Sequence, residues 1–307
     1  MKLLVTGSLF LDSIQIAEIE ALGYELSFHQ HESSPMQTEL KQVDGVICNR
    51  LFDYHNLTQF KQLKFIQLTS AGTDQLPLEE LEKRGIKLFN ARGVYSIPIA
   101  EWVVGKILEF AKQSHPLYGQ QQAHVWQKRR DLQELAGKTA LIIGVGSIGT
   151  EIARRLQAFD LKVIGVGRTE RKCSSCNQYI LSQHLDLVLP DCDIVILSLP
   201  YIPAMHHYFD EHRLALCKKG SVLINVSRGN LIDEKALIRL IRADHFQGVA
   251  LDVFEQEPLP SESDLWNLNQ VIITPHISFV SPRNKARLFK IIMGNLAEII
   301  TQGKDCI

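Results

Sequence analysis

A glycine-rich turn, Gly144-Val145-Gly146-Ser147-Ile148-Gly149, separates an apolar stretch from a helical pattern. The stretch Ala140–Ile143 predicts a buried strand, and Thr150–Ala158 predicts the helix that follows the turn. In such a unit the first glycine permits a tight turn, the second lets the backbone approach a pyrophosphate, and the third lets helix and strand pack closely. The N–H groups at the start of the helix suit an anion. The unit therefore predicts a dinucleotide site at the three glycines, the alternative being a structural turn that binds nothing.

Short apolar runs alternate with helical patterns along almost the whole chain, which is typical of α/β domains with parallel sheets. Before the glycine turn, the expected strands are Leu3–Val5, Gly45–Cys48, Phe65–Leu68 and Ile86–Phe89. The second series is Thr139–Ile143, Lys162–Val166, Asp193–Leu197, Ser221–Val226, Gly248–Leu251 and Val271–Thr274. Six strands are what a doubly wound nucleotide domain needs. Helices are expected at about Ile99–Gln113 and Pro282–Thr301, and the second of these could return to pack on the first domain.

We therefore expect two doubly wound parallel-sheet α/β domains, with a Rossmann nucleotide domain inserted into a flavodoxin-like substrate domain. The expected nucleotide domain spans residues 98–277, and the substrate (catalytic) domain spans 1–97 and 278–307. A length of 307 residues suits two domains of roughly 150 residues each. The crevice between the domains is the expected site.

The charge balance argues against some classes of partner. Thirty-three basic and 34 acidic side chains give a net charge of −1, so binding to nucleic acid or to a membrane surface through bulk electrostatics is not expected. No apolar run approaches the ~18 residues of a membrane span, and Met1–Gly7 resembles a first strand rather than a signal peptide. Six cysteines are too few for a disulfide framework, so we expect a reducing, cytoplasmic location.

The strand after the glycine turn is followed by residues that bear on the choice of cofactor. A site that prefers NAD has an Asp or Glu about 20 residues beyond the turn, which accepts a hydrogen bond from the ribose 2′-hydroxyl. Here the strand ends in Gly167-Arg168-Thr169, and Glu170 comes only later. Arg168 and Thr169, with Arg171 and Lys172 beyond them, suit a 2′-phosphate instead. The sequence therefore predicts a preference for NADP(H), with NAD(H) the alternative if Arg168 is solvated or only stacks on adenine.

Charged side chains follow three of the later strands, near the sheet edge where ligands bind. Arg228 and His276 come just after strands, and Glu257 lies in the loop beyond Leu251. These types fit hydride transfer to a carbonyl beside a carboxylate. His276 can donate the proton that the new alkoxide needs, and Glu257 can orient and stabilise the imidazolium. Arg228 can hold the substrate carboxylate with two parallel hydrogen bonds and polarise the ketone.

Over nearly its whole length the chain resembles the D-isomer-specific 2-hydroxyacid dehydrogenases. The resemblance rests on Leu135–Thr139, the glycine turn, Lys218–Gly229, Asp252–Leu259 and Thr274–His276. It implies an NAD(P)-dependent oxidoreductase acting on CH–OH donors, with Arg228, Glu257 and His276 as the catalytic residues. It implies further cofactor contacts at Ser147, Ile148, Leu199, Pro200, Val226, Ser227 and Asp252, and substrate contacts at Ala71, Gly72, Arg228 and His276. It also implies a homodimer formed through the nucleotide domain, with the region around Trp126 in the contact.

Within this family, glyoxylate and hydroxypyruvate reductases resemble the chain at least as well as phosphoglycerate dehydrogenases do. The expected partner is therefore a small 2-ketoacid. An NAD-dependent 3-phosphoglycerate dehydrogenase and an NAD(H)-sensing corepressor-like protein are the alternatives. One departure is Ile202-Pro203-Ala204-Met205, where the family often has two hydroxyl side chains that contact the cofactor.

Cys173-Ser174-Ser175-Cys176 forms a C-x-x-C pair beside the expected 2′-phosphate segment. One such pair cannot supply the four ligands of a structural zinc site, and no second pair exists. We therefore expect no metal, and a surface loop in which the spacing arises by chance.

Overall fold

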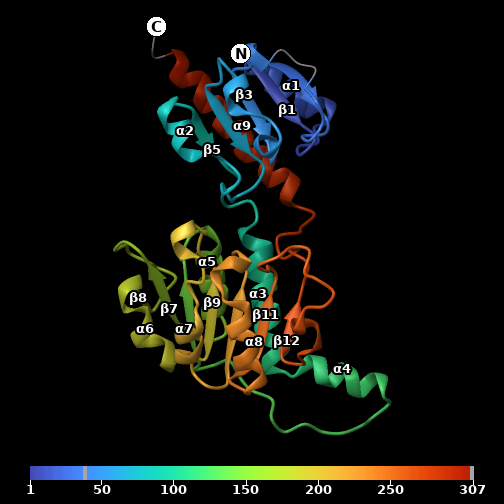
Figure 1. Ribbon diagram of the computed structural model, residues 1–307, viewed down its shortest axis with the longest axis vertical. Coiled ribbons are helices and arrows are strands. Elements are labelled where there is room, and N and C mark those ends of the chain that lie inside the picture. The colour runs from blue at the N-terminus through green and yellow to red at the C-terminus, as the bar shows by residue number, and fades with distance from the viewer. Residues whose placement is uncertain (37–39, 305–307) are drawn as a thin grey trace. The chain divides into compact units, whose positions relative to one another are not determined.

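The computed structural model describes residues 1–36 and 40–304, which form two compact units (Figure 1). Unit 1 consists of Met1–Tyr95 and Ser281–Ile307, and unit 2 consists of Ser96–Val280. Both sheets are parallel, so the expected fold of two parallel-sheet α/β domains is confirmed. No helix among the described residues is both long and apolar enough to cross a membrane.

Unit 1 is built on a five-stranded parallel sheet with the order β2-β1-β3-β4-β5, the flavodoxin-like order. Its elements are β1 (Lys2–Thr6), α1 (Ser13–Ala21), β2 (Glu25–His29), β3 (Gly45–Cys48), β4 (Phe65–Leu68), α2 (Leu78–Lys83), β5 (Lys87–Phe89) and α9 (Asn284–Lys304). The central strands β3 and β4 are buried at every residue, because a parallel sheet is covered on both faces. Their short apolar runs are therefore what made these strands predictable.

The last helix, α9, returns to the sheet with which the chain begins. Leu288, Ile292 and Leu296 are buried in one apolar cluster with Leu3 and Val5 of β1. The Tyr24 hydroxyl also donates to the Leu296 carbonyl over 2.9 Å. The two ends of the chain therefore share one core, as the apolar spacing of the last helix suggested.

Unit 2 is built on a seven-stranded parallel sheet with the order β12-β11-β10-β9-β6-β7-β8. Counted from β6, this is the Rossmann order 3-2-1-4-5-6 with one strand added at the far edge. The strands are β6 (Thr139–Ile143), β7 (Lys162–Gly167), β8 (Gln178–Leu181), β9 (Ile194–Leu197), β10 (Ser221–Asn225), β11 (Phe246–Leu251) and β12 (Val271–Ile273). The helices are α3 (Ser96–Ala111), α4 (Ser114–Gln122), α5 (Ser147–Gln157), α6 (Leu185–Val188), α7 (Glu211–Leu216) and α8 (Glu234–Arg242).

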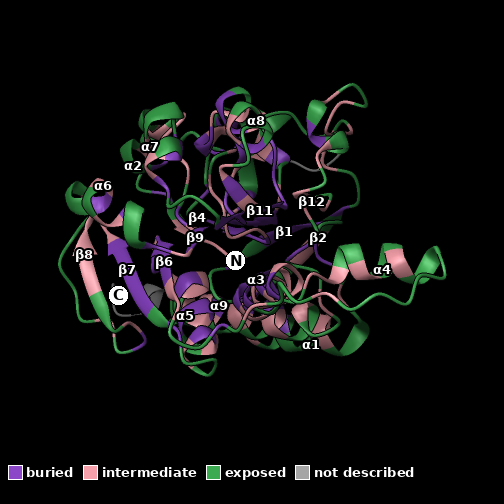
Figure 2. Ribbon diagram, turned by 90° about the horizontal axis from the view of Figure 1, so that it is seen from below, coloured by how far each residue is buried: buried purple, intermediate pink, exposed green. Residues whose placement is uncertain are grey.

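The expectation of six strands in this domain is wrong, because β8 was missed. β8 pairs only with β7, at the edge of the sheet. Its residues are half-buried or exposed, whereas β7 is mostly buried (Figure 2). An edge strand needs no long apolar run, and the short run Tyr179–Leu181 was not recognised as a strand.

Candidate active site

The glycine turn in unit 2 has the geometry of a phosphate cradle. Gly144 has φ +93°, and a Cβ there would lie 2.6 Å from the Leu199 Cα atom. A Cβ on Gly149 would overlap the Gly144 carbonyl oxygen. A Cβ on Gly146, by contrast, would meet no heavy atom within 4 Å. Two glycines are therefore required by close packing, whereas the third leaves open space beside the backbone, as approach of a pyrophosphate requires.

The helix that begins at this turn offers donors to the same space. Gly146 is the N-cap of α5 and has no side chain that could accept from the first amides of the helix, at Ser147 and Ile148. These N–H groups and the positive end of the helix suit an anion. The residues present thus fit a dinucleotide pyrophosphate.

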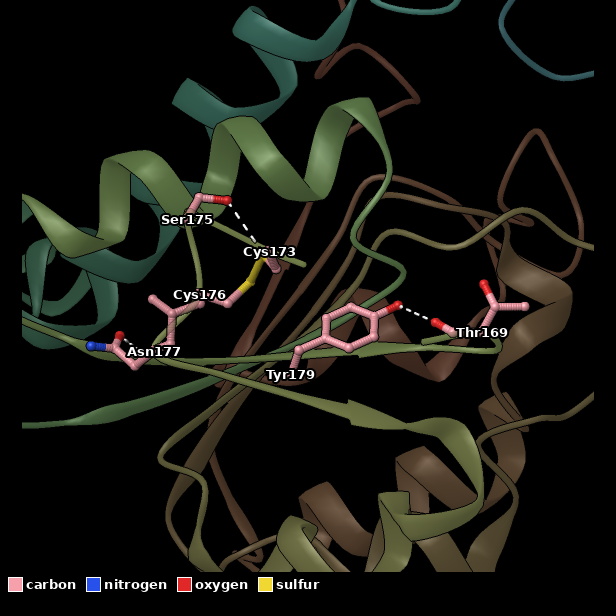
Figure 3. The surroundings of a disulfide bond; sticks show 7 residues. Thr169, Cys173, Ser175, Cys176, Asn177 and Tyr179 are labelled. Carbon is pink, nitrogen blue, oxygen red and sulfur yellow. Dashed lines mark hydrogen bonds between the residues drawn. A yellow bond between two sulfur atoms is a disulfide. The ribbon is translucent and has the colours of Figure 1, made fainter. Parts of the chain in front are cut away.

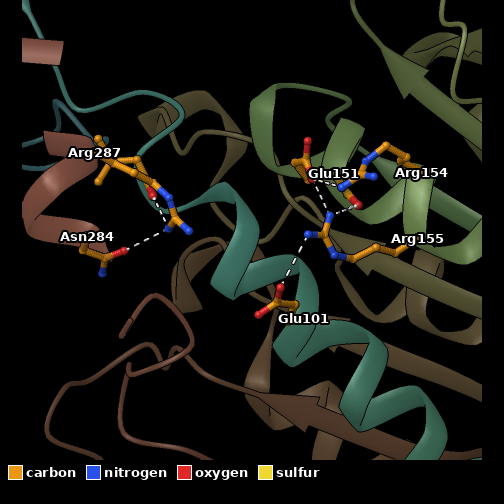
Figure 4. A network of polar contacts seen from close by, with 7 residues as sticks. Glu101, Glu151, Arg154, Arg155, Asn284 and Arg287 are labelled. Carbon is orange, nitrogen blue, oxygen red and sulfur yellow. Dashed lines mark hydrogen bonds and ion pairs between the residues drawn. The ribbon is translucent and has the colours of Figure 1, made fainter. Parts of the chain in front are cut away.

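A polar network fastens α5 to α3 (Figure 4). The Arg155 guanidinium pairs with Glu151 one turn earlier in α5 and lies 3.6 Å from the Glu101 carboxylate in α3. Arg154 also pairs with Glu151 over 2.9 Å. Hydrogen bonds from Arg155 and Arg154 lower the pKa of the Glu151 carboxyl below its usual value. The network helps to hold the helix whose first turn forms the phosphate cradle.

The segment after β7 carries Arg168 and Thr169, and both are exposed. The Thr169 carbonyl accepts a hydrogen bond of 3.2 Å from the Tyr179 hydroxyl in β8 (Figure 3). Gly167 makes room for that phenol, because a Cβ there would overlap the Tyr179 oxygen. Among the described residues no ion pair involves Arg168, so its guanidinium is available at the end of β7.

The loops after β9 and β10 bring the remaining predicted cofactor residues to the same sheet edge. Leu199 packs on Gly144, and the Val226 amide donates to the Leu197 carbonyl over 3.2 Å. Pro200 follows Leu199 and is exposed. The Ser227 hydroxyl is buried and has no hydrogen-bond partner in the described part of the chain. A buried unpaired hydroxyl is costly, and a ligand at this edge would satisfy it.

Glu257 and His276 are 19 residues apart in the sequence but contact each other directly. The His276 Nδ1 atom lies 2.9 Å from the Glu257 Oε2 atom, and both side chains are about two-fifths exposed, at 40% and 38%. Glu257 is itself held, because its Oε1 atom accepts from the Phe254 amide over 3.1 Å. Since Nδ1 faces the carboxylate, Nε2 is the imidazole atom left to meet a substrate.

Arg228 lies in the neighbouring loop, which contacts the Glu257 loop through the backbone. A Cβ on Gly229 would overlap the Phe254 carbonyl carbon, so only glycine permits this approach. The Arg228 guanidinium donates to the Ser227 carbonyl over 2.8 Å, and the Asn225 amide side chain donates to the Arg228 carbonyl over 3.0 Å. The structure thus holds the loops of Arg228, Glu257 and His276 together at one edge of the sheet.

Asp252 positions the His276 loop. It is 1% exposed, and its carboxylate accepts from the Thr274 hydroxyl over 2.5 Å and from the Ile277 and Ser278 amides over 2.9 Å each. This buried carboxylate therefore ties the chain on both sides of His276, which itself has φ +53°. The implied contact of Asp252 with the cofactor stays a prediction.

Ala71 and Gly72 lie in unit 1, in the loop after β4. The Ala71 carbonyl accepts from the Asn90 side chain over 2.8 Å, and the Gly72 carbonyl accepts from the Ser70 hydroxyl over 2.9 Å. These bonds fix the carbonyl groups of the loop within its own unit.

Sequence reasoning missed a polar group at the start of α8. The His207 Nε2 atom lies 2.9 Å from the Glu255 Oε1 atom, and Glu255 and Glu234 each accept a hydrogen bond from the other's amide. Burial is the main cause of the raised pKa of the Glu234 carboxyl, and the nearby Glu255 and Glu257 charges add to it. The adjacent Asp233 is the N-cap of α8, so its carboxylate already accepts from the Ala236 amide. The group fastens the loop that leads to Glu257.

The Cys173–Cys176 pair was expected to be a chance spacing, but the structure joins the two sulfur atoms in a disulfide (Figure 3). A zinc site and a chance spacing in a surface loop were the two alternatives expected from the sequence, and an isolated disulfide was not among them. The missed signal is the spacing itself, since a turn can bring residues three apart to disulfide distance.

The known proteins to which this chain is similar include members of one enzyme family. Residues 104–278 match the family model described as D-isomer specific 2-hydroxyacid dehydrogenase, NAD binding domain. A glyoxylate reductase of Thermofilum pendens is 30% identical over 285 residues, which cover 88% of this chain and 84% of that protein. A D-3-phosphoglycerate dehydrogenase of Sus scrofa is 32% identical over 242 residues, but these cover only 45% of its length. The crystal structure of a glyoxylate reductase from Paecilomyes thermophila shares the fold, with a TM-score of 0.85 at 24% identity over 99% of this chain and 96% of that one.

Proposed function

The chain belongs to the D-isomer-specific 2-hydroxyacid dehydrogenase family, and we propose that it reduces small 2-ketoacids such as glyoxylate or hydroxypyruvate with NADPH. As a member of this family it is an oxidoreductase acting on CH–OH donors. The observation that carries the proposal is the 2.9 Å contact between His276 and Glu257, on loops held beside that of Arg228. This is the set of groups that addition of hydride to a ketoacid requires.

In the proposed reaction the cofactor transfers the hydride, and the side chains transfer the proton and hold the substrate. When bound, a reduced nicotinamide supplies the hydride that adds to the carbonyl carbon of the substrate. His276 then gives the proton on Nε2 to the new alkoxide oxygen, while Glu257 holds Nδ1 and stabilises the imidazolium before transfer. Arg228 holds the substrate carboxylate and polarises the ketone. Oxidation of a D-2-hydroxyacid is the reverse of the same steps, with His276 as the base.

Other residues support the roles proposed for Arg228, Glu257 and His276. Asp252 positions His276, and the first turn of α5 with Ser227 binds the dinucleotide. For Ala71 and Gly72 we retain the role of substrate contacts, carried by their backbone N–H groups. The cytoplasm, where NADPH is available, is the proposed location.

A homodimer is the proposed assembly. Beyond α4 the chain exposes Val125, Trp126 and Leu132, with Trp126 97% exposed. Figure 2 shows α4 largely exposed. Large apolar side chains gathered on one segment favour burial against a partner, and a second copy of the chain would supply one through two-fold symmetry.

The function is tested by a panel of substrates. Purified protein is mixed with glyoxylate, hydroxypyruvate, pyruvate or 3-phosphohydroxypyruvate, and the loss of absorbance of NADPH or NADH is followed. We expect the first two ketoacids with NADPH to have the highest kcat/KM. Preference for the phosphorylated substrate with NADH would instead favour a phosphoglycerate dehydrogenase. Tight cofactor binding without turnover of any substrate would favour a nucleotide sensor.

The cofactor preference is tested at Arg168. The change Arg168→Ala should weaken NADPH binding by ~1–3 kcal/mol, the scale of a hydrogen bond to a charged group, and leave NADH binding nearly unchanged. Calorimetric titration with each cofactor measures both values. Arg239→Ala is the matched control, because Arg239 is 55% exposed on α8 and pairs with Glu211 rather than with a residue of the proposed cofactor site. Equal losses for the two cofactors at Arg168 would contradict the assignment.

A further inference from the structure

We propose that Cys173 and Cys176 form a reversible dithiol–disulfide site that controls the affinity for NADPH, an inference that rests on the proposed cofactor preference. The pair lies in the segment between β7 and β8, just after Arg168, Arg171 and Lys172. In the structure the site is oxidised. Nothing in the proposed reduction of ketoacids uses these two sulfur atoms.

The backbone brings the two cysteines together by itself. The Cys176 amide donates to the Cys173 carbonyl over 3.2 Å, which closes a turn between them. Their Cα atoms are 5.4 Å apart, within the usual range for a disulfide. Both residues are half-buried, so a small oxidant or reductant has access to the pair. The turn has a backbone hydrogen bond of its own in addition to the S–S bond, so reduction would remove one of two links between the cysteines.

Cys176 is the fixed end of the pair. The neighbouring Asn177 exchanges two hydrogen bonds with Val163 of β7, at 2.8 and 2.9 Å. The Cys176 sulfur also packs over Gly165 in the middle of β7, where a Cβ would lie 2.8 Å from it. The same Cβ would lie 2.7 Å from the side chain of Val145 in the glycine turn. Cys176 is therefore anchored on the sheet, next to the phosphate cradle.

Cys173 is the tethered end. The chain before it, Arg168–Lys172, is exposed throughout. Its described contacts with the sheet are weak: the 3.2 Å bond from Tyr179 to the Thr169 carbonyl, and the Arg171 guanidinium 5.5 Å from the Tyr179 ring. The disulfide adds a side-chain link from Cys173, at the end of this cationic segment, to the anchored Cys176, beside the backbone that already joins them. The oxidised form should thus hold the cations in place for the 2′-phosphate, and the reduced form must order them on binding.

The redox step balances with a low-molecular-weight disulfide such as oxidised glutathione. The two cysteine thiols give up two electrons and two protons and form one S–S bond. The small disulfide accepts them, its S–S bond breaks, and two small thiols are released. In a reducing compartment a disulfide of this kind is typically a sensor rather than a structural link.

The test compares the two redox states of the full-length protein. One sample is oxidised with glutathione disulfide and the other is reduced with a phosphine, and mass spectrometry verifies the state of the pair. We expect the oxidised protein to bind NADPH about 3- to 10-fold more tightly, the scale for pre-ordering a short segment, whereas the affinity for NADH changes by less than about twofold. Cys173→Ser and Cys176→Ser should each bind NADPH like the reduced protein and no longer respond to oxidant. Cys217→Ala, which removes a buried free thiol, should keep the response.

The outcomes separate this inference from the function on which it rests. If NADPH bound equally well to the oxidised and reduced protein, the cofactor preference would stand and the redox site would be wrong. If both cofactors responded by the same factor, control through the cationic segment would be wrong. If NADPH bound neither form while NADH bound both, the proposed preference for NADPH would be wrong, and so would the redox site that depends on it.

Discussion

Replacing His276 with alanine is expected to lower kcat by about 10²–10⁴-fold, the usual contribution of a general acid or base. In the proposed site the His276 imidazole protonates the alkoxide through Nε2, because Glu257 holds its Nδ1 atom. Water can replace the proton donor only poorly, because it is not oriented. The glycine turn and α5 are untouched, so the dissociation constant of NADPH should not change.

Two measurements make this result interpretable. Fluorescence titration with NADPH shows whether the cofactor site survives in the variant. His212→Ala is the matched control, because His212 is exposed on α7 and has no role in the proposed chemistry. Turnover by His276→Ala within about threefold of the unchanged protein would refute His276 as the proton donor.

Replacing Arg228 with glutamine should lower kcat/KM for the ketoacid by about 10²–10³-fold. Loss of one member of a hydrogen-bonded charge pair typically costs ~2–5 kcal/mol, because the substrate carboxylate then lacks its partner. Most of the loss should appear as a higher KM, since the carboxylate is bound in both ground and transition states. Arg228→Lys should recover part of the affinity, because it restores the charge but not the paired donors.

Steady-state kinetics with the ketoacid varied at saturating NADPH separates the two constants. Arg242→Gln is the control, because Arg242 lies at the end of α8, 55% exposed and paired with Asp264. If Arg228→Gln changed only the affinity for NADPH, Arg228 would be a cofactor residue and its proposed contact with the substrate would be wrong.

The sequence predicted those elements whose physical constraints are local. Buried parallel strands need continuous apolar runs, so the core strands of both sheets could be read directly. The glycine turn could also be predicted from the sequence. Close packing against Leu199 and within the turn requires glycine at Gly144 and Gly149, so the motif itself indicates the structure. The positions of Arg228 and His276 after strands also predicted that they lie at one sheet edge.

What escaped prediction depends on contacts between distant segments or on edge positions. β8 pairs on one side only, and its short run Tyr179–Leu181 was not recognised as a strand. The bonds from Asp252 to the chain around His276 depend on the pairing of β11 with β12. The close approach of Gly229 to Phe254 could not be predicted from the sequence, because the residues around Gly229 do not indicate which distant segment packs against it.

The central claim is that a dinucleotide held at the Gly144 turn faces Arg228 and His276 in one site. The most direct test is a crystal structure with NADPH and oxamate, an unreactive analogue of a 2-ketoacid. The account predicts the pyrophosphate at the first turn of α5, the His276 Nε2 atom within hydrogen-bond distance of the oxygen that mimics the ketone, and the Arg228 guanidinium on the analogue's carboxylate. Nucleotide bound away from the turn, or oxamate bound without contact to either side chain, would contradict it.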